Sequence, residues 1–262
     1  MNMIKNKTSL IEIEKKIKIR EQTKNVVDIT FYVPCHNEEE LIYRTLDKLI
    51  KIINKFDLTF EILIYNDGST DNTHNEILRF IQDNSNILVN LVNLKKSRGL
   101  GYNYFDGSHV GLGKYYMMIC GDDSETKESI LKILKNIGSA EILIPYFGYG
   151  DKRNLLRKIL SRFYTWIVNL LNGKNIKYYN GVVLHLRENV MRYSSSTSGF
   201  GYQAELLSNL LFHNKSYKHI AISNQDREVG FSRAFRIKNI LSVIHSLLQI
   251  FLKRIKSEIW PI

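Results

Sequence analysis

Two apolar segments that end in acidic turns constrain the fold of this chain most strongly. Residues 62–71 (ILIYNDGSTD) run from a strand-like stretch into a turn that carries Asp67. Residues 115–125 (YYMMICGDDSE) repeat the arrangement and end in Asp122 and Asp123. In an open α/β sheet, ligands bind beyond the carboxyl ends of the strands. The pattern therefore predicts a site for a metal and a phosphorylated ligand at one edge of a sheet.

Strand-like and helix-like segments alternate from residue 28 to residue 146. This order predicts an α/β fold, in which a mostly parallel central sheet is flanked by helices on both faces. After residue 146 the alternation changes to a long basic and aromatic helix followed by shorter elements. The expected strands are 29–34, 60–65, 87–94, 115–120, 141–146, 182–186 and 219–223, and the expected helices are 38–55, 71–82, 99–113, 127–136, 152–171 and 202–212.

The positive charge of the chain is concentrated at its two ends. The net charge is +11, and residues 1–25 and 227–262 each carry seven basic side chains but few acidic ones. We therefore expect a basic helical or flexible lead-in at 1–25, a nearly neutral domain at 26–235 and an amphipathic basic helix at 236–262. Nucleic-acid binding would need a basic stripe on the folded body, so it is not expected. Basic ends suit an anionic membrane surface.

The C-terminal helix has two interpretations. Its apolar residues at helical spacing over 240–255, followed by a basic cluster, suit a helix lying in a membrane interface. The same pattern also suits a helix that packs on the domain. No run reaches the roughly 18 apolar residues that a spanning helix needs, and no secretory leader is evident. We expect a cytoplasmic protein, peripheral to the inner face of the cell membrane. Cys35 and Cys120 fit no metal-binding spacing and suggest buried, reduced thiols.

Three motifs in order resemble the family 2 glycosyltransferases. Residues 33–39 (VPCHNEE) are similar to the opening motif of that family, and residues 66–73 (NDGSTDNT) are similar to its nucleotide-binding turn. Residues 98–101 (RGLG) followed by 121–123 (GDD) complete the order. The resemblance covers about residues 28–235. It implies the GT-A fold and an inverting transferase that uses a nucleotide-diphosphate sugar, with either UDP or GDP, and a divalent metal.

The resemblance assigns the donor side of the site. Asp67 would accept from the base or ribose, although an aspartate before glycine is also common in turns. Asn37 and Glu38 would line the pocket, although acids at 38–40 also suit the first turn of a helix. Arg98 would contact the diphosphate, or is a solvated loop residue. The residues assigned to nucleotide-sugar binding are Pro34, Asn37, Glu38, Asp67, Arg98, Gly121 and Asp122.

Asp122 and Asp123 are the predicted metal ligands and are also assigned to catalysis. Carboxylates near a diphosphate suit Mg²⁺ or Mn²⁺, which take oxygen ligands and bridge phosphates. The family pattern is Asp-x-Asp, but Cys120 occupies the position of the first acid. Glu125 is expected to supply a further oxygen.

The acceptor side resembles the polyprenyl-phosphate branch of the family, which includes dolichol-phosphate mannosyltransferase. Asn180 stands where that branch usually has Asp, and Arg233 stands where it often has Lys. Glu205 lies near the position of the carboxylate that activates a hydroxyl acceptor, or is an acid on a helix surface. A lipid phosphate needs cations rather than a base, and Arg157, Arg227 and Arg233 are the candidates.

The expected function is transfer of a sugar to a polyprenyl-phosphate lipid at the cytoplasmic face of the membrane. The alternative acceptor is a hydroxyl of a cell-surface glycan or lipopolysaccharide precursor. A nucleotidyltransferase would share the acids and the metal, but its glycine-rich basic signature is absent near the first strand. A binding protein that has lost activity is the non-enzymatic alternative. Neither the sugar nor the nucleotide base follows from the sequence.

Overall fold

The computed structural model describes residues 27–148, 151, 153, 155–193, 199, 201–223 and 237–259. The expected lead-in at 1–25 and the predicted phosphate ligands Arg227 and Arg233 lie outside these residues. Side chains are described for only part of the last helix, at 243–255.

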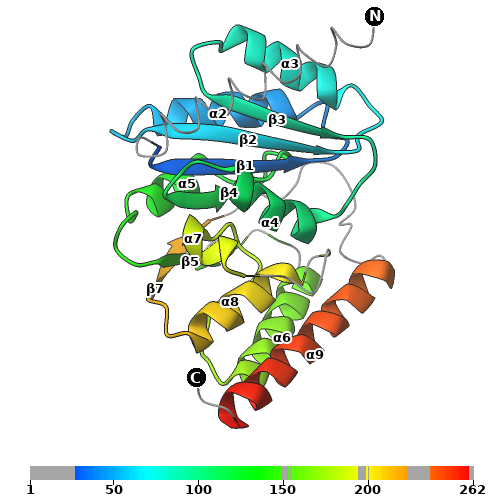
Figure 1. Ribbon diagram of the computed structural model, residues 1–262, viewed down its shortest axis with the longest axis vertical. Helices are drawn as coiled ribbons and strands as arrows, with labels where there is room; N and C mark the ends of the chain where they lie inside the picture. The colour runs from blue at the N-terminus through cyan, green and yellow to red at the C-terminus, as the bar shows by residue number, and fades with distance from the viewer. Residues whose placement is uncertain are drawn as a thin grey trace, which may run out of the picture.

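A seven-stranded sheet organises the fold (Figure 1). Its strand order is β3-β2-β1-β4-β6-β5-β7, and every pair is parallel except those that involve β6. The predicted α/β architecture with a mostly parallel sheet is confirmed. The strands are β1 (Ile29–Cys35), β2 (Phe60–Asp67), β3 (Val89–Leu94), β4 (Tyr115–Met118), β5 (Ile142–Phe147), β6 (Leu184–Leu186) and β7 (Tyr217–Ile222).

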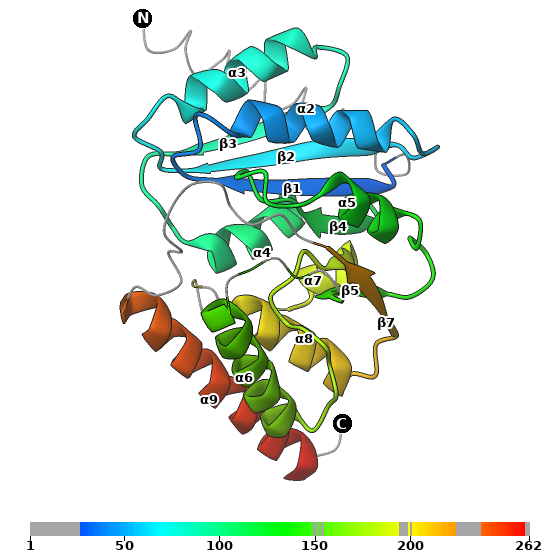
Figure 2. The ribbon, with the colours of Figure 1, turned by 180° about the vertical axis from the view of Figure 1, so that it is seen from behind.

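Helices cover both faces of the sheet. Figure 1 shows α4 in front of the sheet, with α2 and α5 behind it, and Figure 2 shows the reverse. At the far end from α3, the helices α6, α8 and α9 pack together below the sheet. The helices are α2 (Ile42–Ile53), α3 (Thr73–Asp83), α4 (Leu100–Val110), α5 (Lys127–Leu134), α6 (Leu155–Asn172), α7 (Arg187–Met191), α8 (Tyr202–Phe212) and α9 (Ile237–Ile259).

The central strand β1 explains why the sheet is buried on both faces. It reads almost continuously apolar (ITFYVPC), as expected for a strand between two layers of helices. Thr30 is buried in β1, and its Oγ1 donates to Glu61 Oε1 at 2.6 Å and accepts from the backbone N of Gly113 at 2.9 Å. A Cβ on residue 113 would lie 2.3 Å from the backbone N of Thr30, so this close approach requires glycine.

The predicted element boundaries were wrong in several places. The first helix begins at Ile42 rather than at residue 38, because residues 36–41 form a loop in which Asn37 has φ 56°. Strand β4 ends at Met118, and the five-residue helix α7 was not predicted. Among the described helices, none has both the length and the apolar character required to cross a membrane.

Candidate active site

Three loops meet at one edge of the sheet. They follow β1, β2 and β4, which are neighbours in the strand order and run parallel. Their carboxyl ends therefore point the same way, and the loops at 36–41, 68–72 and 119–126 lie together. This is the edge at which the sequence predicted a site.

Asn37 joins the first loop to the second. Its backbone lies in the left-handed region, which asparagine tolerates better than most residues. Its N–H donates to Ser69 Oγ at 2.9 Å, and its Oδ1 accepts from the backbone N of Thr70 at 2.8 Å. Asn37 therefore orders the edge of the site, and its predicted contact with a nucleotide stays a prediction.

Asp71 and Thr73 connect the same two loops at the start of α3. Asp71 Oδ1 accepts from the backbone N of Thr73 at 3.0 Å and from Thr73 Oγ1 at 2.5 Å. Thr73 Oγ1 in turn accepts from the backbone N of Glu38 at 2.8 Å, and Asp71 Oδ2 accepts from the backbone N of Glu39 at 3.3 Å. Asp71 thus orders the turn and the start of α3. The pocket-lining role of Glu38 stays a prediction.

Asp67 binds the loop that follows β3. Its carboxylate accepts from Ser97 Oγ at 2.6 Å, from the backbone N of Arg98 at 2.8 Å and from the backbone N of Gly99 at 3.3 Å. Partial burial raises the pKa of Asp67, but these hydrogen bonds outweigh it and hold the pKa below its ordinary value. Asp67 is therefore ionised, and it orders the loop on which Arg98 lies.

Gly68 is required by the same contact between loops. Its φ is +73°, and a Cβ there would lie 2.8 Å from the backbone N of Ser97. The Asp-Gly pair therefore forms a turn that brings the loop after β2 directly against the loop after β3.

Arg98 is held at the rim of this edge. Its Nη2 lies 3.0 Å from Asp106 Oδ2, and its guanidinium stacks on the ring of Tyr102 at 4.7 Å. Asp106 also accepts from the hydroxyl of Tyr65 at 2.8 Å. The guanidinium is partly exposed, and its predicted contact with a diphosphate stays a prediction.

The loop after β4 brings together three side chains of types that can bind a metal ion. The ligand atoms of Cys120, Asp122 and Glu125 lie within 4.8 Å of one another. The backbone N of Cys120 donates to Glu125 Oε2 at 3.2 Å, and the backbone N of Ser124 donates to Asp122 Oδ1 at 3.2 Å. Burial raises the pKa of the Glu125 carboxyl. The two carboxylates suit a hard divalent cation that also takes oxygen atoms from a diphosphate, whereas the thiol is a softer ligand that such a cation does not favour.

Cys120 is partly exposed, although the sequence suggested a buried thiol. Cys35 is a buried free thiol, as expected, but Cys120 is partly exposed and belongs to the metal-binding group. The expectation that both thiols are buried was therefore wrong for Cys120. Gly121 brings this loop against β1, because its N–H donates to the carbonyl of Pro34 at 3.1 Å and a Cβ there would lie 2.9 Å from the Cβ of Cys35.

Asp123 turns toward α2 instead of joining this group. Its φ is 57°, and its carboxylate forms ion pairs with Arg44, at 2.7 Å, and with Lys48. Lys48 Nζ also donates to the carbonyl of Glu125 at 2.5 Å. The role of Asp123 as a metal ligand stays a prediction, and the structure groups Glu125 with Asp122. Sequence reasoning missed Arg44 and Lys48, and their only signal was the four-residue spacing that puts both on one helix face.

Glu205 is buried in α8 with 1% of its surface exposed. The interpretation as a surface acid was therefore wrong. Its Oε2 accepts from the hydroxyl of Tyr193 at 3.1 Å, and that hydroxyl accepts from Lys253 Nζ of α9 at 2.9 Å. Glu205 thus joins α8 to α9 through Tyr193, and its catalytic role stays a prediction. Arg157 is a partly exposed residue of α6.

Comparison with known proteins gives one family and several relatives. The family model described as "Glycosyl transferase family 2" matches residues 30–198, which is more than half of the chain. A dolichyl-phosphate beta-glucosyltransferase of Dictyostelium discoideum is 33% identical over 192 residues, covering 65% of this chain and 58% of that protein. One from Trichomonas vaginalis is 30% identical over 151 residues, covering 52% of this chain and 46% of that protein.

A bacterial relative and a solved structure extend the comparison. Poly-beta-1,6-N-acetyl-D-glucosamine synthase of Staphylococcus aureus is 31% identical over 146 residues, covering 55% of this chain and 34% of that protein. The chain thus spans about half the length, or less, of the curated relatives it matches. Glucosyl-3-phosphoglycerate synthase from Mycobacterium tuberculosis, solved with Mn²⁺ and UDP, shares the fold, with a TM-score of 0.65 and 14% identity over 90% of this chain and 81% of that chain.

Proposed function

Because the chain belongs to glycosyl transferase family 2, we propose that it moves a sugar from a nucleotide-diphosphate sugar to the phosphate of a polyprenyl-phosphate lipid. The observation that carries this proposal is the grouping of Cys120, Asp122 and Glu125 at the sheet edge that also carries Asn37 and Asp67. In this arrangement the group around Asp122 would bind the diphosphate, and the loops joined by Asn37 and Asp67 would bind the nucleoside.

The metal-binding group serves the diphosphate. Asp122 and Glu125 would hold a divalent cation, either Mn²⁺ or Mg²⁺, through their carboxylate oxygens, with the softer thiol of Cys120 beside them. A bound cation would neutralise the negative charge that develops on the leaving diphosphate. Lys48 supports this loop from α2, because it contacts both the Glu125 carbonyl and the Asp123 carboxylate.

The loops after β1, β2 and β3 serve the nucleoside. Asn37 and Asp67 fix these loops to one another, so a nucleotide meets an ordered surface rather than mobile chain. The fold neighbour is described in complexes with UDP and with UDP-glucose. We therefore propose UDP-glucose as the donor to test first, with a GDP sugar as the alternative.

Two observations favour a phosphate acceptor over a hydroxyl. The relatives from Dictyostelium and Trichomonas are named for dolichyl phosphate. In addition, a hydroxyl acceptor needs a general base within reach, but Glu205 is buried and bonded to Tyr193. A phosphate oxygen is already an anion. It forms the new bond to the anomeric carbon as the bond from that carbon to the nucleoside diphosphate breaks, with inversion.

A glycan hydroxyl remains the second candidate acceptor. Poly-beta-1,6-N-acetyl-D-glucosamine synthase of Staphylococcus aureus, whose name describes glycan synthesis, is also a relative. In that case Glu205 would have to become accessible to the acceptor.

The test is an assay of the full chain with UDP-glucose or GDP-mannose, polyprenyl phosphate and Mn²⁺. We expect a glycosyl-phosphate lipid that mild acid cleaves, and we expect no product with EDTA or with Asp122→Asn. Glu205→Gln should retain most turnover with a phosphate acceptor, whereas loss of a general base costs about 10²- to 10⁴-fold. Transfer to a glycan hydroxyl but not to lipid phosphate would contradict the proposal.

A further inference from the structure

The exposed apolar side chains of the described residues are concentrated on α6 and α9. Trp166 on α6 is 58% exposed, and Leu252 on α9 is 56% exposed. Phe163 stacks on Trp166 with the ring centroids 5.9 Å apart, so two aromatic rings are presented side by side. Soluble proteins rarely leave a contiguous apolar patch of this kind without a partner.

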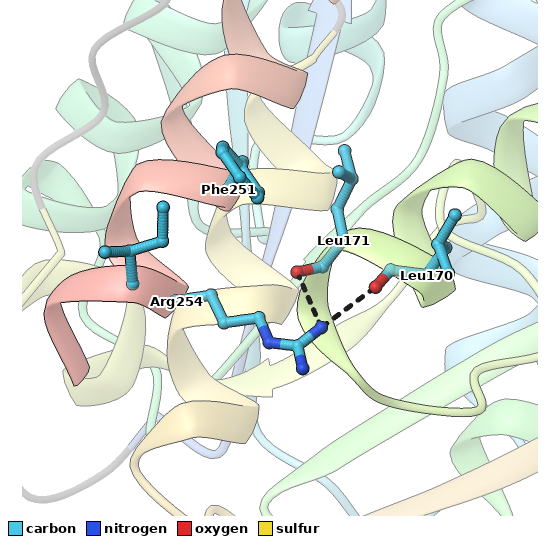
Figure 3. Close-up of a pocket in the computed structure, with 5 residues that line it drawn as sticks. Leu170, Leu171, Phe251 and Arg254 are labelled. Carbon is cyan, nitrogen blue, oxygen red and sulfur yellow. Dashed lines mark hydrogen bonds between the residues drawn. The ribbon is translucent and has the colours of Figure 1, made fainter. Parts of the chain in front are cut away.

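The two helices form one continuous surface, which we call the α6–α9 surface. Figures 1 and 2 both show α6 and α9 side by side at the end of the molecule opposite α3. Figure 3 shows that Arg254 of α9 donates to the carbonyls of Leu170 and Leu171, at 3.0 and 3.4 Å, where α6 ends. A pocket of about 420 Å³ lies between the helices there, lined also by Phe251 and Ile255.

The charges around the α6–α9 surface are positive. The sequence of α6 contains three basic residues, Arg157, Lys158 and Arg162, and no acidic residue. Arg162 is exposed next to Phe163, whereas on α9 Lys253 donates to Tyr193 and Arg254 to the carbonyls at the end of α6. The sequence of α9 has one acidic residue, in its last turn. Helices with an apolar face and neighbouring cations bind interfaces that contain anionic lipids.

We propose that the α6–α9 surface docks the protein onto an anionic lipid bilayer, with the two helices lying in the interface. Charge complementarity selects this occupant, because cations beside exposed aromatic rings meet lipid phosphates and acyl chains together. The inference goes beyond the proposed function, since it holds whichever acceptor the site uses. It also adds α6 to the membrane contact that the sequence suggested for the C-terminal helix alone.

Vesicle sedimentation of the full chain tests the proposal without any nucleotide sugar. We expect binding to phosphatidylcholine vesicles that contain phosphatidylglycerol, weaker binding to pure phosphatidylcholine, and loss of binding as salt is added. The double variant Phe163→Gln/Leu252→Gln changes one exposed residue on each helix and should weaken binding at least about tenfold, because both side chains lose burial in lipid. Leu78→Gln on α3, where the leucine is 45% exposed, is the matched control.

A fluorescence measurement locates the contact. The chain contains two tryptophans, so Trp260→Phe leaves Trp166 as the reporter, and brominated lipids should quench it. Circular dichroism melting should show that the double variant folds normally. Three results would overturn the proposal: no binding to anionic vesicles, equal binding by the double variant and the Leu78→Gln control, or a solution dimer that the double variant converts to a monomer without any vesicle binding. None of them bears on lipid-phosphate transfer, which the product assay measures separately.

Discussion

Replacing Asp67 with asparagine tests whether this residue acts by ordering the loop after β3. In the structure Asp67 Oδ1 accepts from Arg98 N, and Oδ2 accepts from Ser97 Oγ and Gly99 N. Asparagine has one acceptor oxygen and one amide group. In either orientation of that amide, one backbone N–H of the loop faces another donor and loses its hydrogen bond.

The size of the effect follows from these contacts. A hydrogen bond to a charged acceptor contributes about 1.5–3 kcal/mol, and the remaining bonds lose their charge assistance. Because Asp67 is only half-buried, we expect the substitution to destabilise the closed conformation of the loop by about 2 kcal/mol. This corresponds to a factor of about 30 in the equilibrium constant for loop opening. The global stability should change little, since the loop lies at an exposed edge.

Hydrogen exchange and calorimetry together measure this effect. We expect the amides of Arg98 and Gly99 to exchange about thirtyfold faster in Asp67→Asn, and we expect UDP to bind more weakly in the presence of Mn²⁺. Asp57→Asn, in an exposed loop, is the matched control. Unchanged exchange at both amides together with weaker UDP binding would refute the reasoning, because Asp67 would then act on the nucleotide directly.

Three further predictions concern the supports of the site and the fold. Lys48→Met removes the contact with the Glu125 carbonyl, so calorimetry should show Mn²⁺ binding weakened about tenfold in the presence of UDP; unchanged binding would exclude a supporting role. Hydrogen bonds from Ser216 lower the pKa of Glu141 to about 2, so its contribution is complete above pH 4.5 and is lost as pH falls toward 2. Because the Glu141 side chain is partly exposed and solvent screens its interactions, Glu141→Gln should remove about 1–2 kcal/mol of unfolding free energy at pH 7 and little at pH 2, and equal losses in urea titrations at both pH values would contradict this. Gly113→Ala should lower the unfolding free energy by about 1–3 kcal/mol because the new Cβ meets β1, and an unchanged melting temperature would argue against that contact.

The sequence predicted those parts of the structure that depend on local residue patterns. Strands β1 and β2 were predicted because each is an almost continuous apolar run, which is typical of a strand covered on both faces. The meeting of their acidic turns at one edge followed from the parallel direction of the strands. By contrast, β6 is only three residues long and pairs antiparallel with two distant strands, so nothing local predicted its direction.

In the candidate site, too, some side-chain positions could be predicted from the sequence and others depend on tertiary contacts. Asp122, Asp123 and Glu125 all lie after one strand, and the sequence cannot tell which carboxylates converge. The left-handed backbone of Asp123 and the cations of α2 turn that acid away, while Cys120 and Glu125 join Asp122. Burial of Glu205 beside Tyr193 is also a tertiary property, since it depends on how α8 packs.

By itself the sequence determined the order of the strands and of every helix except α7, the edge at which the acidic turns meet and the family resemblance, because periodicity and turn chemistry are local properties of the chain. The tertiary structure alone decided which acids group with Cys120, that Lys48 supports their loop, and that the described part of the chain leaves apolar side chains of α6 exposed beside α9. These features depend on contacts between residues far apart in the chain. Such contacts are selected by packing and charge pairing in the folded state, and no local pattern encodes them.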